Sequence, residues 1–214
     1  MRITCLHTAA SNIDVFEAAA TALGIAPGVL HHEVRPDLLA AAEHLGYLSD
    51  DVAGTTAEVL LALARHADAV VLTCSTLGPS LDTIPHPIPA PILRADEALA
   101  VEAAQAGARV VVLCAVATTL APTSTLFHRV AQRTGATVDV QLVAGAWDLF
   151  KAGDLQGYLC SIAKAADRAY LDGASIVALG QASMGGAARL VSSGPPALAS
   201  ASAGLKAALN AIRG

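Results

Sequence analysis

Residues 69–78 have the sequence AVVLTCSTLG, and residues 176–185 have the sequence IVALGQASMG. Each segment is a short apolar run, rich in β-branched residues, that passes into a loop of small polar residues and glycine. Such a run is typical of a buried parallel strand, and parallel sheets bind ligands beyond the carboxyl ends of their strands. The two segments start 107 residues apart, which is half of the 214-residue chain. The sequence therefore contains one strand-and-loop unit twice.

The same spacing relates other parts of the two halves. It places Gly28 on Gly135. It likewise places Pro89 on Pro196. The chain is rich in alanine, so chance identities are common, but glycines, prolines and strand ends in one register are harder to obtain by chance. We therefore predict two pseudo-equivalent halves, related without a gap by the single offset of 107 residues.

Apolar, β-branched runs alternate with alanine-rich helical segments along the whole chain. The expected strands are 2–7, 29–34, 69–74, 91–93, 109–114, 137–143, 175–180 and 196–199. The expected helices are 12–23, 36–46, 50–66, 96–106, 123–134, 155–172, 185–191 and 202–212. This alternation favours parallel sheets.

The predicted fold class is α/β, with two pseudo-symmetric Rossmann-like halves. Each half is a parallel four-stranded sheet flanked by helices, and we expect an active-site cleft between the halves. The first domain is predicted to contain residues 1–97 plus 200–214, and the second residues 98–199.

Composition narrows the class of protein. Hydrophobic residues make up 54% of the chain and charged residues 14%, which is typical of a compact globular protein. The net charge of -5 and the scattered basic residues argue against nucleic acid or an anionic membrane as partner. No apolar stretch is long enough to cross a bilayer, and the N-terminus lacks the features of a signal peptide. We therefore expect a cytoplasmic protein.

The carboxyl ends of the expected strands lead into four loops, 8–12, 74–78, 117–119 and 181–185, which are rich in small polar residues. Backbone N–H groups and hydroxyls at such ends suit a small anion such as a carboxylate. The candidate substrate-binding residues are Ser11, Asn12, Ser75, Thr76, Thr118, Thr119, Ala182 and Ser183. Because Ser, Thr and Asn also favour helix N-caps and turns, a role in a cap or turn is an equal alternative for each of these polar residues.

Cys74 is the candidate reactive residue, because it closes a strand and enters a polar loop. Unpaired backbone N–H groups at such a position lower the pKa of a thiol and favour the thiolate. Cys5, Cys114 and Cys160 fall inside expected strands or a helix, where a cysteine is usually a small apolar residue. With no C-x-x-C pair, all four are expected to be free thiols.

A metal site is not expected from this sequence. His31 and His32 are adjacent in an expected strand, so their side chains point to opposite faces and cannot share one ion. Arg35 follows that strand as either a surface arginine or a contact for a second carboxylate. A nucleotide enzyme lacks support, since neither G-x-G-x-x-G nor G-x-x-x-x-G-K-[ST] occurs.

In their order and spacing, these features resemble the aspartate/glutamate racemase superfamily. That superfamily also includes hydantoin racemase, maleate cis-trans isomerase and arylmalonate decarboxylase. The resemblance covers nearly the whole chain: its length, its duplication and the cysteine after the third strand. It implies two pseudo-symmetric α/β domains, no cofactor, and a small carboxylate substrate. It also implies two cysteines that exchange a proton at the carbon next to the carboxylate. Homologous folds often pair, which leaves a homodimer open.

Cys74 in LTCSTLG matches the first cysteine of that family. The segment LGQASM at residues 179–184 is similar to the Leu-Gly-Cys-Ala-Gly-Met pattern of hydantoin racemases, so Gln181 stands where the second cysteine is expected. A neutral amide can donate or accept hydrogen bonds, but it is no general base near neutral pH. We predict Cys74 as the single catalytic thiol, with Gln181 as its partner in the site.

The predicted function is therefore a racemase- or isomerase-superfamily enzyme that transfers a proton at a carbon next to a carboxylate without a cofactor. If Gln181, a water or a substrate group replaces the second acid, the reaction is racemisation or isomerisation. One thiol alone would suffice for a decarboxylase of the lyase class, or for addition across a double bond. A carboxylate-binding protein without turnover is the alternative outside the enzymes.

Overall fold

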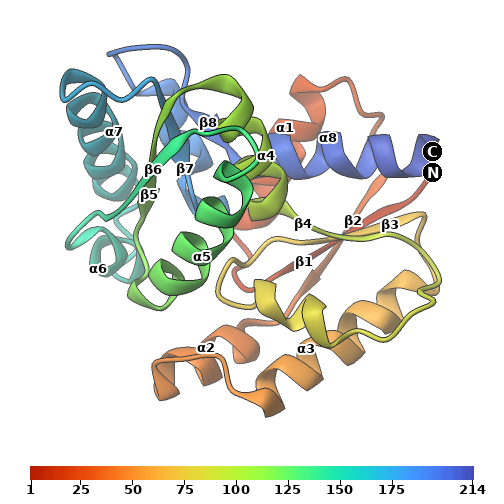
Figure 1. Cartoon of the computed structure of the whole chain (residues 1–214). Helices are drawn as coiled ribbons and strands as arrows, with labels where there is room; N and C mark the ends of the chain where they lie inside the picture. The colour runs from red at the N-terminus through yellow and green to blue at the C-terminus, as the bar shows by residue number, and fades with distance from the viewer. The chain divides into compact units, whose positions relative to one another are not determined.

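The computed structural model describes all 214 residues (Figure 1). Contacts between residues divide the chain into two compact units, Met1–Ala98 with Ala201–Gly214, and Leu99–Ser200. Each unit contains one four-stranded sheet whose strands are all parallel, with helices packed beside it. The predicted fold class of two α/β halves, each built on a parallel four-stranded sheet, is confirmed.

The first unit has the strand order β2-β1-β3-β4. Its strands are β1 (Ile3–His7), β2 (Leu30–Val34), β3 (Ala69–Leu72) and β4 (Ile92–Arg94). Its helices are α1 (Asn12–Ala22), α2 (Pro36–Leu45), α3 (Asp50–Ala64), the 3₁₀ helix η1 (Gly78–Thr83) and nearly all of α8 (Ser200–Arg213). Helix α4 (Ala95–Ala106) contains the boundary between the units.

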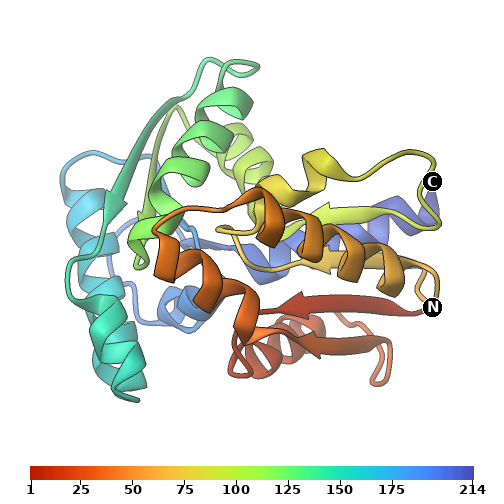
Figure 2. The ribbon, with the colours of Figure 1, turned by 90° about the horizontal axis from the view of Figure 1, so that it is seen from below.

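Alternation along these strands sends successive side chains to opposite faces of the sheet. Leu6 and Leu72 point to the face covered by α2 and α3, where they pack with Leu60 in an apolar core. The opposite face is covered by α1 and α8, and there the ring of His7 contacts Phe16 of α1. Figure 2 shows α3 on one side of this sheet, with α1 and α8 on the other.

The second unit has the strand order β6-β5-β7-β8. Its strands are β5 (Arg109–Cys114), β6 (Thr137–Leu142), β7 (Ile176–Leu179) and β8 (Leu198–Ala199). Its helices are α5 (Leu120–Ala131), α6 (Ala146–Lys151), α7 (Leu155–Leu171) and the 3₁₀ helices η2 (Ala117–Thr119) and η3 (Ala182–Arg189). Leu113 and Leu179 pack against Tyr158 and Ile162 of α7 to form its main core.

The register of the paired strands shows which residues of the two sheets are equivalent. The central strands β1 and β3 pair in the same register as β5 and β7, and both correspond at an offset of 107 residues. On the next strand outward, Leu30 takes the place that Val138 takes in the second sheet, which is an offset of 108. The prediction of one gapless offset is therefore wrong for β2 and β6.

The opposite edge of each sheet departs further from the prediction. Leu93 of β4 corresponds to Leu198 of β8, which is an offset of 105 residues. Pro196 is thus equivalent to Pro91, and its match to Pro89 was a coincidence of sequence. Both shifts arise in the segments that connect a central strand to the edge strand after it, where a residue more or less costs little. A central strand is fixed by partners on both sides.

Several short helices differ from expectation, including η2 at Ala117–Thr119. Residues 185–191 were expected to be a helix, but the segment is the 3₁₀ helix η3, which begins earlier at Ala182. Neither α6 nor η1 was expected, because each is only six residues long and carries no clear helical period. No helix of the chain is both long enough and apolar enough to cross a membrane.

Candidate functional site

Cys74 lies two residues beyond the end of β3, in the loop that leads to η1. Because β1 and β3 are parallel neighbours, the loop after β1 begins beside it. From that loop the Thr8 hydroxyl makes a hydrogen bond to the Cys74 sulfur. The backbone N–H groups of Leu77 and Thr76 also donate to this sulfur. The loops after β1 and β3 together supply three donors for a developing thiolate.

Burial nevertheless dominates the ionisation of this thiol. Cys74 is half-buried by exposed area, and desolvation of its sulfur raises the pKa of the thiol above the ordinary value of 9.0. The hydrogen bonds from Thr8, Leu77 and Thr76 pull the pKa down, and the Asp96 carboxylate pushes it up again. The prediction that the strand end lowers this pKa is wrong in its net direction. Cys74 rests as a neutral thiol near pH 7.

A buried ion pair lies behind the Cys74 loop. Arg94 at the end of β4 donates from Nε and Nη2 to the two Asp96 carboxylate oxygens, at 3.0 and 2.8 Å. Their side chains are only 7% and 5% exposed. The guanidinium lies against Gly78, where any side chain would collide with it. The pair therefore supports the first turn of η1, and sequence reasoning missed it because the two residues lie outside the loop motifs.

The other candidates in the first unit differ in their surroundings. Ser11 is exposed and does not cap α1 through its side chain. Asn12 is 6% exposed, and its Oδ1 has no hydrogen-bond donor. Ser75 and Thr76 are buried in the Cys74 loop and have polar partners. Because Ser11 makes no cap, the capping alternative fails at this position.

Gln181 begins the corresponding loop of the second unit. Its Oε1 accepts hydrogen bonds from the backbone N–H groups of Ala115 and Val116, at 2.5 and 3.1 Å. These two hydrogen bonds to residues at the end of β5 orient the amide, and the Nε2 group is left to act as a donor. The preceding residue must be glycine, because a Cβ at Gly180 would lie 2.8 Å from the Leu113 carbonyl oxygen.

The remaining candidates follow β5 and β7 in the second unit, and the polar ones have partners. Thr119 is buried, does not cap α5 through its side chain, and donates its hydroxyl to the Val116 carbonyl oxygen at 2.5 Å. Ser183 makes a 2.7 Å hydrogen bond to the Tyr158 hydroxyl. Ala182 is buried, and Thr118 is half-buried with a polar partner. Capping is thus excluded for Thr119 as it is for Ser11.

The two loops are equivalent in position but unlike in chemistry. At the offset of the central strands, Cys74 corresponds to Gln181, and its hydroxyl donor Thr8 corresponds to Ala115. At the offset of the edge strands, Arg94 corresponds to Ala199. The first unit alone therefore combines a thiol, a hydroxyl donor and a buried ion pair. Thr8 could have been found from sequence as the residue that follows the strand next to Cys74.

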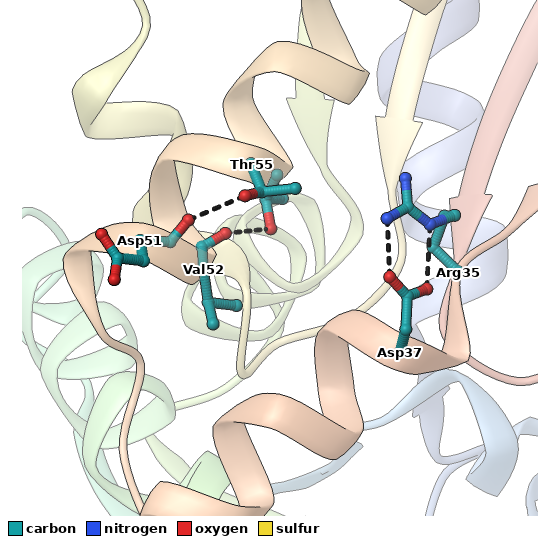
Figure 3. Close-up of polar contacts among 6 residues, drawn as sticks. Arg35, Asp37, Asp51, Val52 and Thr55 are labelled. Carbon is teal, nitrogen blue, oxygen red and sulfur yellow. Dashed lines mark hydrogen bonds and ion pairs between the residues drawn. The ribbon is translucent and has the colours of Figure 1, made fainter.

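Arg35 follows β2, as expected, but its donors are directed to its own helix. Its Nε and Nη2 donate to the two carboxylate oxygens of Asp37 in the first turn of α2, at 2.9 and 2.6 Å (Figure 3). This contact lowers the pKa of Asp37 below 3.8. Figure 3 also shows the Thr55 hydroxyl donating to the Asp51 carbonyl oxygen within α3. These contacts stabilise helices and leave Arg35 out of the candidate site.

The other three cysteines fit a structural role, and all four are free thiols. Cys5 and Cys114 are fully buried in β1 and β5. Burial raises the pKa of Cys5 to about 12. Cys160 is half-buried on α7, so it is the thiol that competes with Cys74 for reagents.

Fold and site together define an α/β protein of two parallel-sheet units that presents a thiol at one strand end and an amide at the equivalent strand end. The family model described as Asp/Glu/Hydantoin racemase matches residues 35–208. The chain belongs to the Asp/Glu/hydantoin racemase family. A search among curated proteins finds no significant match.

Solved structures with the same fold include several racemases. An aspartate racemase from Picrophilus torridus is 12% identical, with a TM-score of 0.73 over 100% of this chain and 95% of that one. An allantoin racemase from Klebsiella pneumoniae is 17% identical, with a TM-score of 0.69 over 100% and 88%. A glutamate racemase from Aquifex pyrophilus is 17% identical, with a TM-score of 0.63 over 98% and 83%. At such low identity these likenesses establish the fold.

Proposed function

We propose that this protein catalyses cofactor-independent proton transfer at a carbon next to a carboxylate of a small acid, with Cys74 as its single catalytic thiol. Membership of the Asp/Glu/hydantoin racemase family supports the reaction class. The solved structures that share its fold are named as aspartate, allantoin and glutamate racemases, which supports a small polar substrate. In the donor-rich loops, the proposed substrate contacts are Ser11, Asn12, Ser75, Thr76, Thr118, Thr119, Ala182 and Ser183.

The observation that carries this proposal is the unequal chemistry of two equivalent loops. Cys74 has three hydrogen-bond donors directed at its sulfur. Gln181 uses its amide oxygen on two backbone N–H groups, so its Nε2 can donate to a substrate oxygen but cannot remove a proton. A racemase that works from both faces of a carbon needs an acid and a base on opposite sides. Of these two residues, only Cys74 can transfer a proton.

The raised pKa of Cys74 favours the role of proton donor. When a geminal diacid loses CO₂, the electrons of the broken C–C bond form an enediolate at the remaining carboxylate. The S–H bond of Cys74 then breaks, its proton forms the new C–H bond, and the thiolate recovers a proton from water. The donors from Thr8, Thr76 and Leu77 would stabilise that thiolate while it exists. Such a one-sided reaction places decarboxylation ahead of two-base racemisation.

The deciding experiment incubates the protein in deuterated water with a panel of small acids and follows each carbon-bound proton by NMR. The panel contains aspartate, glutamate, α-substituted malonates and simple dicarboxylates. We expect loss of CO₂, or deuterium incorporation on one face, with at least one member of the panel. Both should vanish in Cys74→Ala and persist in Cys160→Ala, the matched variant of a half-buried cysteine outside the loop.

Two results would overturn the proposal. Rapid racemisation of free aspartate or glutamate that is lost in Cys74→Ala would mean that another group supplies the second base. No exchange and no CO₂ from any acid, together with saturable binding of one, would identify a binding protein that has no turnover.

A further inference from the structure

A chain of four polar side chains crosses the face of the first sheet that α1 covers. Glu17 of α1 contacts His32 of β2, with 3.0 Å between Oε1 and Nε2. The other ring nitrogen of His32, Nδ1, is 2.9 Å from Nε2 of His7. Nδ1 of His7 is 3.0 Å from the Thr73 hydroxyl oxygen. We name these four residues the Glu17–Thr73 relay. It ends at the residue before Cys74.

Counting donors along the relay determines where its protons lie. The Thr73 hydroxyl donates to the Leu6 carbonyl oxygen at 3.0 Å, so it can only accept from His7. His7 therefore carries its proton on Nδ1, and its Nε2 is an acceptor. His32 must then donate from Nδ1 to His7 and from Nε2 to the Glu17 carboxylate. Both ring nitrogens of His32 therefore act as donors, whereas His7 donates from Nδ1 alone.

The surroundings agree with this assignment. His7 is fully buried, and desolvation together with the neighbouring His32 lowers the pKa of His7 to about 3, which keeps it neutral. His32 is 12% exposed, and its Nε2 lies 3.0 Å from a carboxylate oxygen of the half-exposed Glu17. Cys5 is the other titratable group at this face, and it remains a neutral thiol.

A metal ion is the competing occupant, because Cys5, His7 and His32 offer three ligand atoms within 4.8 Å of one another. The ring geometry argues against it. The ring centroids of His7 and His32 are 5.1 Å apart and the facing nitrogens 2.9 Å, so the two nitrogens point straight at each other. A tetrahedral zinc ion would hold them about 3.3 Å apart and direct both lone pairs to a point off that line. The observed geometry is that of a shared proton.

The relay is absent from the second unit. The positions equivalent to His7, Thr73 and His32 are occupied by Cys114, Gly180 and Val140. The relay is therefore present in the unit that contains Cys74 and is not a general feature of the repeated fold. His7 is also followed directly by Thr8, the hydroxyl donor of Cys74, so the His7–Thr73 bond joins the two strand ends that carry donor and thiol.

We propose that the Glu17–Thr73 relay holds one proton between its two histidines and thereby positions Cys74 for reaction. Its residues are positioning residues that act through Thr73 and Thr8. The effect on reactivity rests on the proposed role of Cys74, whereas the protonation of His32 can be tested without any substrate.

The first test measures the ring ¹⁵N signals of the histidines in the intact protein at about pH 7, where an ordinary histidine is mostly neutral. We expect two protonated nitrogens on His32, and on His7 a proton at Nδ1 alone. In Glu17→Gln, the new amide can donate to Nε2 of His32, so His32 should become neutral and keep its proton on Nδ1. A role confined to packing would not move these signals. A neutral His32 in the wild type would overturn the proposal.

The second test measures the rate at which iodoacetamide alkylates Cys74, followed by mass spectrometry. His32→Leu removes the hydrogen bond that holds the His7 ring at Nε2, so the bond from His7 Nδ1 to Thr73 should weaken. We expect alkylation of Cys74 to slow by about threefold to tenfold, as for a weakened hydrogen bond to a charged group. The matched control is His31→Leu, whose side chain points to the opposite face of β2, and its rate should equal that of the wild type.

Two outcomes of these measurements would refute the relay. Equal alkylation rates in His32→Leu and His31→Leu, with both variants folded, would remove the link to Cys74. Co²⁺ is added to the protein as a probe of the competing metal site. If one equivalent binds and gives a thiolate charge-transfer band that Cys5→Ser abolishes, a metal occupies the place that we assign to a proton. Because alkylation needs no substrate, a failed turnover assay leaves this inference standing, and a failed relay leaves the catalytic proposal standing.

Discussion

Replacing Gln181 separates the structural role of its oxygen from the proposed role of its nitrogen. In Gln181→Ala, the backbone N–H groups of Ala115 and Val116 lose their shared acceptor, and these residues are only 4% and 3% exposed. Each buried donor left unpaired costs about 1–3 kcal/mol, so losing the acceptor of both should lower the unfolding free energy by about 2–6 kcal/mol. With a urea m-value of about 2 kcal/mol/M, the midpoint should fall by about 1–3 M.

Gln181→Glu provides the matched comparison. A carboxylate keeps an acceptor for both N–H groups and should hold stability within about 1 kcal/mol of the wild type. It removes the only donor of the side chain, so substrate affinity or turnover should still fall. Gln156→Ala, an exposed change in α7, controls for loss of a glutamine as such. The reasoning fails if Gln181→Ala unfolds at the wild-type urea midpoint, or if Gln181→Glu is as unstable as Gln181→Ala.

Introducing a second thiol at position 181 also removes the amide oxygen. Because sulfur is a weak acceptor, Gln181→Cys should be destabilised like Gln181→Ala. Its racemase activity must therefore be measured where denaturation curves show it to be folded.

Three further predictions concern single side chains. Thr8→Val removes the hydroxyl donor of Cys74, so the pKa of that thiol should rise further and alkylation at about pH 7 should slow about tenfold, whereas Thr8→Ser should react like the wild type. Backbone N–H donors hold the pKa of Asp167 below 3.8, so its stabilising contribution is present above that pH and is lost in acid. Plots of unfolding free energy against pH for the wild type and Asp167→Asn should therefore converge as the pH falls below 3.8. Parallel plots would contradict this. Gly180→Ala should lower the unfolding free energy by about 1–3 kcal/mol, because its Cβ would meet a β5 carbonyl oxygen at 2.8 Å, while Gly54→Ala, with open space in α3, should be neutral or stabilising in the same denaturation assay.

Much of the fold is legible in the sequence, because parallel strands and their helices have strong local signatures. The apolar runs that became β3 and β7 end at Leu72 and Leu179, followed by the polar loops expected after them. The duplication was visible at one offset because the central strands allow no insertion. The edge strands had drifted by a few residues, and a repeat of Pro89 in Pro196 concealed this shift.

The candidate residues could also be predicted from the sequence, but their ionisation and hydrogen bonds could not. The sequence marked Cys74 by its place at a strand end and Gln181 by its equivalent place in the repeat. The ionisation of Cys74 depends on how much water the folded loop removes, and a local pattern does not contain that quantity. The binding of the Gln181 oxygen to the end of β5 likewise needed the pairing of strands 66 residues apart.

The sequence by itself determined the two α/β halves and their strand-end loops. It also determined that a thiol stands in one half at the position where the other half has an amide. Only the tertiary structure decided what surrounds them. His7, Glu17 and His32 come from the three successive elements β1, α1 and β2, and they meet because β1 pairs with β2 beneath α1. Periodicity predicts which face a side chain occupies, since that depends on the local backbone. Hydrogen-bond partners and desolvation depend on neighbours that the folded chain alone brings together.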